Sequence, residues 1–175
     1  MQNRIYIVGY MGCGKSTVAR IVARRLGWEM IDMDKRIEGR FRQTINEIFA
    51  TRGESGFRKM ERNMLEEVCG MENVVISTGG GTPCQSDNME VMLETGKVVY
   101  LRMSAESLAK RLIVTHGTRN RPILKGKSEE ELHAFIEEQL AKRKAYYERA
   151  THVMDTDGNS AEETATAVIN ITQEA

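Results

Sequence analysis

The 175-residue sequence lacks the marks of a membrane protein, a disulfide scaffold or a structural metal site. It has no apolar run long enough to cross a bilayer, and it shows no internal repeat or low-complexity tract. Its three cysteines, Cys13, Cys69 and Cys84, are odd in number and include no C-x-x-C pair. Its three histidines are isolated and have no metal-ligand spacing. These absences favour a protein of the reducing cytoplasm over an extracellular, disulfide-bonded protein or a zinc-stabilised protein.

The sequence also lacks an excess of charge of either sign. Lysine plus arginine number 25, aspartate plus glutamate number 25, and the formal net charge at pH 7 is zero. We therefore expect no general attraction to nucleic acid or to anionic membranes, and we interpret local basic clusters as sites. With 41% hydrophobic and 29% charged residues, the chain is long enough to bury a core, and we expect one domain over residues 1–175.

What the sequence has instead is a glycine-rich loop between an expected strand and an expected helix. Residues 9–16 read GYMGCGKS and fit the phosphate-binding pattern G-x-x-x-x-G-K-[ST]. In such a loop, glycines let backbone N–H groups surround phosphate oxygens. Lys15 then faces the β- and γ-phosphates, and the Ser16 hydroxyl is a candidate Mg²⁺ ligand. The alternative is an ordinary strand–helix turn that contains glycines.

The context of this loop favours nucleotide binding. Ile5, Ile7 and Val8 form a short apolar run that is typical of a buried parallel strand. After the loop, apolar residues recur at helical spacing until Gly27, which is a candidate helix C-cap. Because the strand already begins at Arg4, we expect no targeting peptide.

Short apolar segments and helical patterns alternate along the remaining chain. This alternation predicts an α/β fold with a mainly parallel sheet. The long strand-free stretch from Lys35 to Cys69 suggests an inserted helical subdomain. Residues 115–127 combine glycines, a proline and cationic side chains without a period, which predicts a basic loop. The further expected strands are 28–31, 74–76, 98–101 and 152–155, and the expected helices are 35–41, 44–51, 54–69, 88–94, 104–113, 128–149 and 160–172.

Asp32 and Asp34 follow the second expected strand, at the edge of the sheet where ligands bind in open α/β folds. If the chain stays extended, their spacing of two sends both side chains the same way. One carboxylate is a candidate for holding Mg²⁺ through water, and the other for accepting a hydrogen bond from a substrate hydroxyl. The alternative for Asp34 is an N-cap of the next helix. P-loop enzymes usually carry a magnesium aspartate after a hydrophobic strand, but the run 74–76 ends in Ser77, so Asp32 is the candidate.

Three further features are candidates for an anion pocket. Residues 79–81 are consecutive glycines after a strand, which expose backbone N–H groups and allow close ligand approach, unless they form only a flexible turn. Arg143 lies on an otherwise apolar helical stripe and needs a partner, either a protein carboxylate or a ligand anion. Arg58 and Glu61 share a helix face, where the alternative is a solvated salt bridge.

Two arginines of the basic loop, Arg119 and Arg121, suit a lid over bound ATP. Such a lid excludes water and stabilises the charge of the transferring phosphoryl group. The alternative is a solvated positive loop.

Taken together, these motifs resemble those of the shikimate kinases, which are P-loop kinases of the nucleoside-monophosphate-kinase-like group. The resemblance covers nearly the whole chain and rests on GYMGCGKST (9–17), DMD (32–34), INEIFATRGESGFRKME (45–61), STGGGT (77–82), RNRP (119–122) and AKRKAYY (141–147). It implies a three-layer sandwich with a five-stranded parallel sheet of order 2-3-1-4-5. It also implies a substrate-binding helical insertion over about residues 33–62 and a lid over about 112–127. The implied activity is ATP-dependent phosphorylation of shikimate with Mg²⁺ in aromatic amino acid biosynthesis, usually by a monomer.

The resemblance also implies roles for individual residues. Asp34 holds the shikimate hydroxyl that is phosphorylated, as base or orienter, while Arg58 and Arg143 hold the shikimate carboxylate. The implied sets are Lys15, Asp34 and Arg121 for catalysis; Gly12, Cys13, Gly14, Lys15, Ser16, Thr17, Arg111 and Arg121 for ATP; Asp34, Arg58, Gly80 and Arg143 for shikimate; and Ser16 and Asp32 for Mg²⁺.

Two features depart from the family pattern, and two rival functions stay open. The loop 157–159 lacks an arginine that some members place against adenine, and the segment between Arg111 and Arg121 is longer than in some members, which leaves the adenine contacts open. One rival is a kinase of another small hydroxy acid such as gluconate, and the other is a nucleotide-dependent switch without transferase activity. The Asp-x-Asp pair, the glycine triplet and the two arginines favour shikimate, because a switch needs no second anion pocket.

Overall fold

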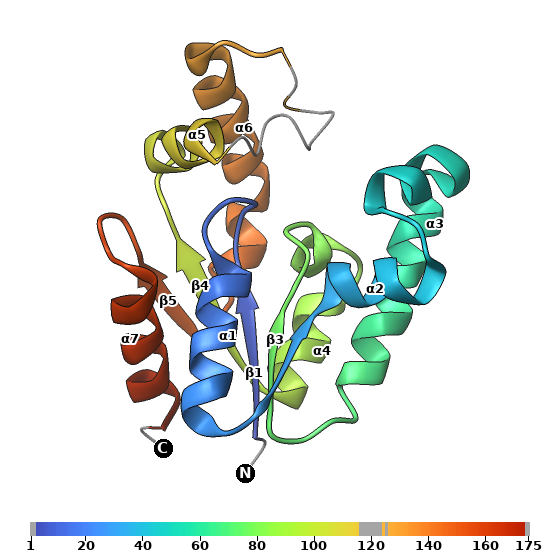
Figure 1. The fold of residues 1–175 in the computed structure, drawn as a ribbon, viewed down its shortest axis with the longest axis vertical. Helices are drawn as coiled ribbons and strands as arrows, with labels where there is room; N and C mark the ends of the chain where they lie inside the picture. The colour runs from blue at the N-terminus through green and yellow to red at the C-terminus, as the bar shows by residue number, and fades with distance from the viewer. Residues whose placement is uncertain (1–2, 116–123, 125, 174–175) are drawn as a thin grey trace.

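A computed structural model describes residues 3–115, 124 and 126–173 of the chain. Five parallel strands form one sheet in the order β2-β3-β1-β4-β5, which confirms the expected fold class and strand order (Figure 1). In the centre of the sheet, Tyr6 lies opposite Ile76 on one side and opposite Val98 on the other. The strands are β1 (Arg4–Val8), β2 (Glu29–Asp32), β3 (Val74–Ser77), β4 (Lys97–Arg102) and β5 (His152–Asp155).

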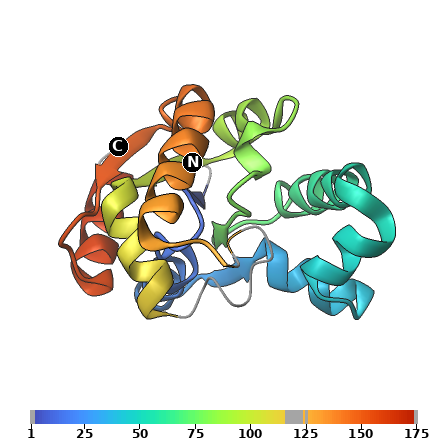
Figure 2. The same cartoon turned by 90° about the horizontal axis from the view of Figure 1, so that it is seen from above.

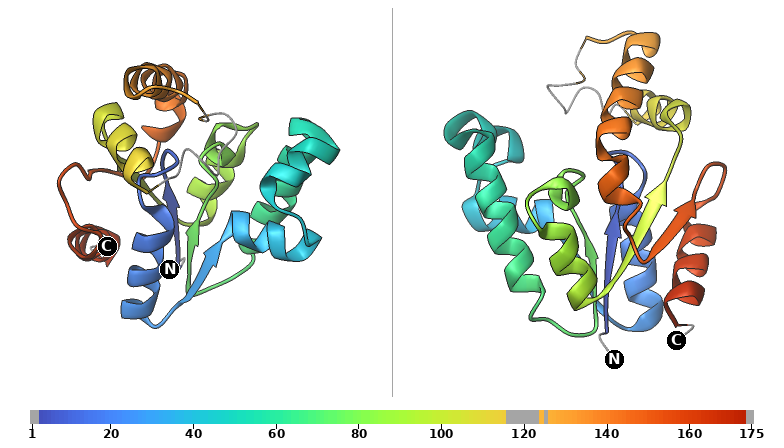
Figure 3. Two further views of the ribbon diagram at one scale, coloured as in Figure 1. Left: turned by 45° about the horizontal axis from the view of Figure 1, so that its top comes forward. Right: turned by 180° about the vertical axis from the view of Figure 1, so that it is seen from behind.

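Helices cover both faces of the sheet, as the alternation of side chains along β1 requires. Ile5 and Ile7 pack on the face covered by α1 and α7, whereas Tyr6 and Val8 pack on the face covered by α3 and α4 (Figure 3). The core is therefore split into two layers by a sheet whose central strand is buried along its whole length. The helices are α1 (Lys15–Leu26), α2 (Met33–Phe41), α3 (Ile45–Val68), α4 (Asn88–Thr95), α5 (Ala105–Val114), α6 (Glu129–Tyr147) and α7 (Ala161–Gln173), with the 3-10 turn η1 (Thr82–Cys84).

Local sequence signals set most helix ends. Helix α1 ends at Gly27, whose φ of 68° lies in the left-handed region that glycine adopts without strain. Helices α3 and α6 begin with capping boxes at Thr44 and Ser128, and Ser104 caps α5 through the amide of Ser107. The expected break at Gly53 is confirmed as a kink inside α3, with φ 68° and ψ 178°.

The chain does not stay extended from Asp32 to Asp34, so the condition for both side chains to point the same way is not met. Helix α2 begins at Met33, two residues earlier than the sequence suggests, because the Asp32 carboxylate caps it by accepting a hydrogen bond from the amide of Lys35. Asp34 thus lies in the first turn of α2 and is not the N-cap that was the alternative for it.

The carboxyl edge of the sheet lies between two groups of helices. Seen from above, α5 and α6 stand on one side of this edge, and α2 and α3 stand on the other (Figure 2). Residues 116–123 and 125, which include Arg119 and Arg121, lie outside the described residues. Among the helices that the structure describes, none has the length and apolar character to cross a membrane. Cys13, Cys69 and Cys84 are free thiols in the structure.

Candidate active site at the carboxyl edge of the sheet

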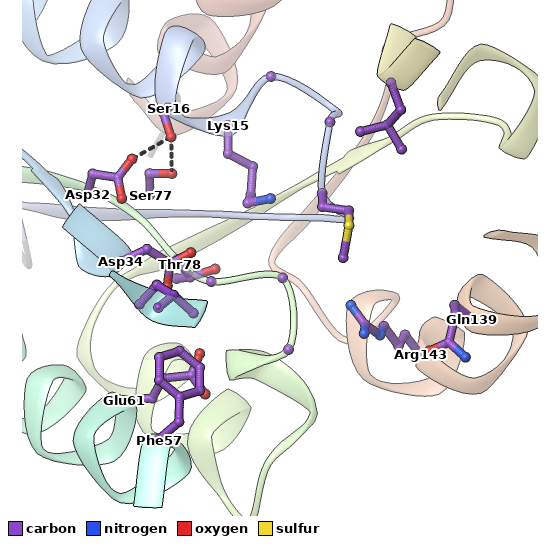
Figure 4. A pocket seen from close by; sticks show the side chains of 18 of the residues that line it. Lys15, Ser16, Asp32, Asp34, Phe57, Glu61, Ser77, Thr78, Gln139 and Arg143 are labelled. Carbon is purple, nitrogen blue, oxygen red and sulfur yellow. Dashed lines mark hydrogen bonds between the residues drawn. The ribbon is translucent and has the colours of Figure 1, made fainter. Parts of the chain in front are cut away.

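A cavity of about 940 Å³ opens at the carboxyl ends of β1, β2 and β3. Lys15, Asp34 and Arg143 reach it from three different helices (Figure 4). Cys13 is an exception among the predicted residues, because its side chain is buried behind the loop and does not line the cavity. The predicted residues that do line it are Gly12, Gly14, Lys15, Ser16, Thr17, Asp32, Asp34, Arg58, Gly80, Arg111 and Arg143.

The glycine-rich loop wraps one end of this cavity. Gly14 is the N-cap of α1 and has φ 96°, a left-handed conformation that lets the loop turn directly into the helix. The positive end of the α1 dipole therefore faces the cavity, which favours an anion there. The Lys15 ammonium donates a hydrogen bond to the carbonyl of Tyr10 at 3.0 Å, so its charge also lies at the loop.

Ser16 and Asp32 form an oxygen-rich corner beside the loop. The Ser16 hydroxyl donates a hydrogen bond to Oδ2 of Asp32 at 2.6 Å and lies 3.2 Å from the hydroxyl of Ser77. Mg²⁺ prefers oxygen ligands and usually keeps several waters next to one or two protein groups and substrate phosphates. A hydroxyl and a carboxylate beside a phosphate-binding loop fit that requirement.

Asp34 also lines the cavity, and its surroundings disfavour the charged form of its carboxyl group. Burial of the carboxyl, together with the nearby carboxylates of Glu61 and Asp32, raises its pKa to about 6, while Lys15 opposes the shift. An aspartate with this pKa is ionised at neutral pH but accepts a proton readily. It is therefore suited to orienting a hydroxyl and receiving its proton.

Glu61 holds Arg58 at the wall of the cavity. The Glu61 side chain is buried, accepts a hydrogen bond from the hydroxyl of Thr82 at 2.6 Å, and binds Nη1 of Arg58 at 2.5 Å. Glu54 lies 3.3 Å from the other terminal nitrogen of Arg58. The guanidinium rests against the backbone of Gly81, where a Cβ would come within 2.8 Å of it. With Glu61 buried and Arg58 only partly exposed, the pair is an element of the cavity wall and not a solvated salt bridge.

Arg143 differs from Arg58, because the described part of the chain offers it no carboxylate partner. Among the described residues, no carboxylate lies within 4.0 Å of its guanidinium, which sits over the ring of Tyr10. A Cβ at Gly80 would lie 3.4 Å from Nη1 of Arg143, so the backbone of Gly80 packs close to the guanidinium. The Tyr147 hydroxyl donates a hydrogen bond to the Gly80 carbonyl at 2.6 Å, and burial raises the pKa of Tyr147. The positive charge of Arg143 is therefore available to a ligand anion.

Arg111 lies on the nucleotide-loop side of the cavity. A Cβ at Gly14 would come within 3.6 Å of its guanidinium, and Nη1 lies 3.8 Å from the sulfur of Met103. Arg111 thus stands next to the N-terminus of α1, where an anion is favoured, and its role in binding ATP stays a prediction.

Sequence reasoning missed several residues that build the cavity. Glu61 was left among the charges of a helix face, and its distance of three residues from Arg58 was the signal that could have found it. Gln139, which lines the cavity, and Thr82 and Tyr147, which donate hydrogen bonds to the lining residues Glu61 and Gly80, carried no signal, because these positions depend on the folded chain.

The fold and the cavity define a P-loop phosphotransferase, with a phosphate-binding loop at one end and a carboxylate and two arginines at the other. The shikimate kinase family model matches residues 11–173. A shikimate kinase of Parabacteroides distasonis is 52% identical over 155 residues, which cover 89% of this chain and 88% of that protein. The chain belongs to the shikimate kinase family.

Two solved structures agree with this assignment. The crystal structure of shikimate kinase from Bacteroides thetaiotaomicron has a TM-score of 0.91 and 44% identity, covering 97% of this chain and 98% of that one. Shikimate kinase from Acinetobacter baumannii in complex with shikimate has a TM-score of 0.87 and 34% identity, covering 98% and 93%. The resemblance inferred from the motifs is therefore confirmed.

Proposed function

We propose that the chain transfers the γ-phosphoryl group of ATP to the 3-hydroxyl of shikimate and releases ADP and 3-phosphoshikimate. One observation carries this proposal beyond family membership. A single cavity joins the phosphate-binding loop to Asp34, Arg58 and Arg143, so a nucleotide and a small hydroxylated acid fit side by side. Membership of the family and the similarity to a shikimate-bound relative support shikimate as the acceptor.

The nucleotide end binds and neutralises the phosphates. Backbone N–H groups of residues 12–17 surround the phosphate oxygens, and Lys15 adds a positive charge. Arg111 contributes from α5, and Arg121, which lies outside the described residues, contributes from the lid. Ser16 and Asp32 hold Mg²⁺, which when bound neutralises charge on the phosphate oxygens.

The acceptor end positions shikimate for in-line transfer. Arg58 and Arg143 hold its carboxylate, because a planar guanidinium matches a carboxylate with two parallel hydrogen bonds. The backbone of Gly80 lies between Arg143 and the nucleotide loop and contacts the carbocyclic ring of shikimate. Asp34 accepts the hydrogen bond of the attacking hydroxyl and takes its proton as the O–P bond forms. The transition state is loose, so orientation and charge neutralisation supply most of the catalysis.

Two structural assignments belong to the same proposal. Residues of about 33–62 act as the substrate-binding insertion of a single domain, and about 112–127 act as the lid. The free thiols support a cytoplasmic location, and the balanced charge supports a protein that binds neither nucleic acid nor membrane; the family resemblance supports a monomer.

An assay with parallel acceptors tests the proposal. Purified protein with Mg²⁺ and ATP is given shikimate, gluconate or a nucleoside monophosphate, and ADP release is measured. We expect ADP to form at a rate that depends on shikimate. Release with gluconate alone would establish the rival hydroxy-acid kinase, and no acceptor-dependent release would leave a nucleotide switch.

Arg58→Ala is expected to raise the KM for shikimate by about 10- to 100-fold, because charge-assisted hydrogen bonds contribute about 1.5–3 kcal/mol. The KM for ATP is expected to change less than about threefold. Steady-state kinetics with each substrate varied in turn measure both. Arg62→Ala is the matched control, since Arg62 lies one turn further along α3 and pairs with Glu66 and Asp87 outside the cavity. Equal increases in both KM values would contradict the assignment of Arg58 to shikimate binding.

Glu61→Gln is expected to raise the KM for shikimate by about 10-fold, because glutamine keeps the contact with Thr82 but loses the ion pair that orients Arg58. It is also expected to lower the pKa of Asp34, since the Glu61 carboxylate raises it. The acid limb of the rate profile should then move to lower pH. Glu66→Gln, an exposed position on the same helix, is the control. An unchanged KM with an unchanged acid limb would contradict the role of Glu61.

A further inference from the structure

The phosphate-binding loop carries a side chain that its motif does not require. Tyr10 follows the first glycine of the pattern, at a position where any residue satisfies it. The ring nevertheless is 1% exposed and lies under the guanidinium of Arg143, with 5.1 Å between the guanidinium carbon and the ring centre. That distance is within the range of a cation–π interaction.

The two arginines of the acceptor site are held in different ways. Arg58 is fixed by ion pairs with Glu61 and Glu54. Arg143, which belongs to α6, has no carboxylate within 4.0 Å among the described residues. The Tyr147 hydroxyl is a hydrogen-bond partner of its guanidinium, but without an ion pair the long side chain still loses rotamer entropy when a ligand orders it, which weakens binding. An aromatic face under the guanidinium restricts that freedom and leaves the positive charge for the ligand.

Tyr10 itself is firmly placed. Its carbonyl accepts hydrogen bonds from the amide of Cys13 at 3.3 Å and from the ammonium of Lys15 at 3.0 Å. Its neighbours in the loop reach the same region, since Gly9 and Met11 present backbone atoms 3.5 Å from a Cβ placed on Gly80. The nucleotide loop is therefore in direct contact with the arginine that faces the acceptor.

We propose that Tyr10 is a positioning residue for the acceptor site: its ring holds the Arg143 guanidinium in the orientation that binds the shikimate carboxylate. This inference rests on the proposed function, in which Arg143 is the carboxylate ligand. It makes the nucleotide loop serve both substrates, through its backbone for the phosphates and through one aromatic side chain for the acid.

Calorimetric titration of shikimate in the absence of nucleotide tests the inference. Tyr10→Phe keeps the ring, and Tyr10→Met keeps an apolar side chain of similar reach without a ring. We expect Tyr10→Phe to bind shikimate within about twofold of wild type and Tyr10→Met to bind it about 5- to 30-fold more weakly. The affinity for MgADP is expected to change less than about twofold in both, which a general distortion of the loop would not allow.

Fluorinated phenylalanines at position 10 test the inference even if the Tyr10→Met variant fails to fold. Mono-, di- and trifluorination withdraw charge from the ring face with little change of volume. We expect the shikimate dissociation constant to rise stepwise along this series. A constant affinity along the series would overturn the cation–π role of Tyr10.

A double-mutant cycle with Arg143→Met separates this inference from the proposed function. We expect Arg143→Met to weaken shikimate binding, and Tyr10→Met to add less than about twofold on that background. Additive losses, or a Tyr10→Phe variant as weak as Tyr10→Met, would overturn the inference while the proposed function stands. A wild-type protein that binds MgADP but not shikimate would overturn the proposed function and the inference together.

Discussion

Asp34→Asn is expected to lower kcat for shikimate phosphorylation by about 10²- to 10⁴-fold, the range that a positioned general base contributes. Asparagine matches the aspartate in shape and still contacts the acceptor hydroxyl, but it cannot take the proton. The KM for ATP should change little, because the nucleotide end of the cavity is built by other residues. Initial rates of ADP release at saturating substrates measure the loss. Asp87→Asn, an exposed aspartate at the start of α4, is the matched control.

The pH dependence gives the Asp34 prediction a second, independent readout. The pKa of Asp34 is raised to about 6 by burial and by neighbouring carboxylates. The wild-type kcat/KM for shikimate should therefore fall as pH drops through about 6, where the carboxylate becomes protonated. The residual activity of Asp34→Asn should lack this limb. A wild-type profile that stays flat from pH 8 to 5, or a variant within about fivefold of wild type, would contradict the role of Asp34.

Stability should move in the opposite direction to activity. The pKa of Asp34 is higher in the folded protein than in the unfolded chain. Its contribution to the free energy of unfolding is therefore fully present below about pH 4 and is lost as pH rises through about 6. Asp34→Asn should thus be more stable than wild type at pH 8, by on the order of 2 kcal/mol, and the difference should vanish towards pH 4. Denaturant unfolding at the two pH values measures this. A folded, stabilised and nearly inactive variant would show that the charge of Asp34 is kept for chemistry at a cost in stability.

The fold followed from the sequence because its signals are local. The apolar run of β1, the loop of residues 9–16 and the αL cap at Gly27 each depend on a few neighbouring residues. The strand order came from the family resemblance, since no local pattern specifies which strands lie side by side. A local error concerned Asp32, whose side chain caps α2, so that the helix begins at Met33 and not at residue 35 as expected.

The candidate site was predictable as a set of groups but not as an arrangement. Tyr147 reaches Gly80 across 67 positions of sequence, and Thr82 reaches Glu61 across 21. Such contacts arise from tertiary packing, which periodicity and spacing do not encode. For the same reason, the sequence left open whether Arg143 faces a protein carboxylate or a ligand. Only the folded chain surrounds it with tyrosine and glycine.

The glycine triplet of residues 79–81 is a case in which the structure decides between two interpretations of the sequence. Its composition suggested either close ligand approach or a flexible turn. In the structure, a Cβ at Gly80 would approach Arg143 and one at Gly81 would come within 2.8 Å of Arg58, so the segment is packed between the two arginines. Close approach of Arg58, and not flexibility, therefore favours glycine at position 81, whereas a Cβ at Gly80 would meet contacts of 3.4 Å and longer.

Lys15→Met is expected to lower kcat by about 10²- to 10³-fold, the usual effect of removing one preorganised charge from a transition state. Methionine keeps the apolar stem but removes the ammonium that faces the phosphates from the start of α1. Shikimate affinity without nucleotide should change less than about threefold, because Arg58 and Arg143 hold the acceptor. Rates of ADP release and calorimetric titration measure the two effects. Lys142→Met, an exposed lysine that pairs with Glu138, is the matched control.

The same substitution should also move the acid limb of the rate profile. Lys15 lowers the pKa of Asp34, so its loss should push the limb to higher pH, opposite to the shift expected for Glu61→Gln. Opposite shifts from a lost cation and a lost anion are what one titrating carboxylate between them requires. If both variants moved the limb the same way, or neither did, the group that titrates in the rate would not be Asp34. If the two variants shift the limb in opposite directions, the pKa of Asp34 depends both on Lys15 at the nucleotide end and on Glu61 at the acceptor end. The protonation of this one carboxyl then couples the two ends of the cavity.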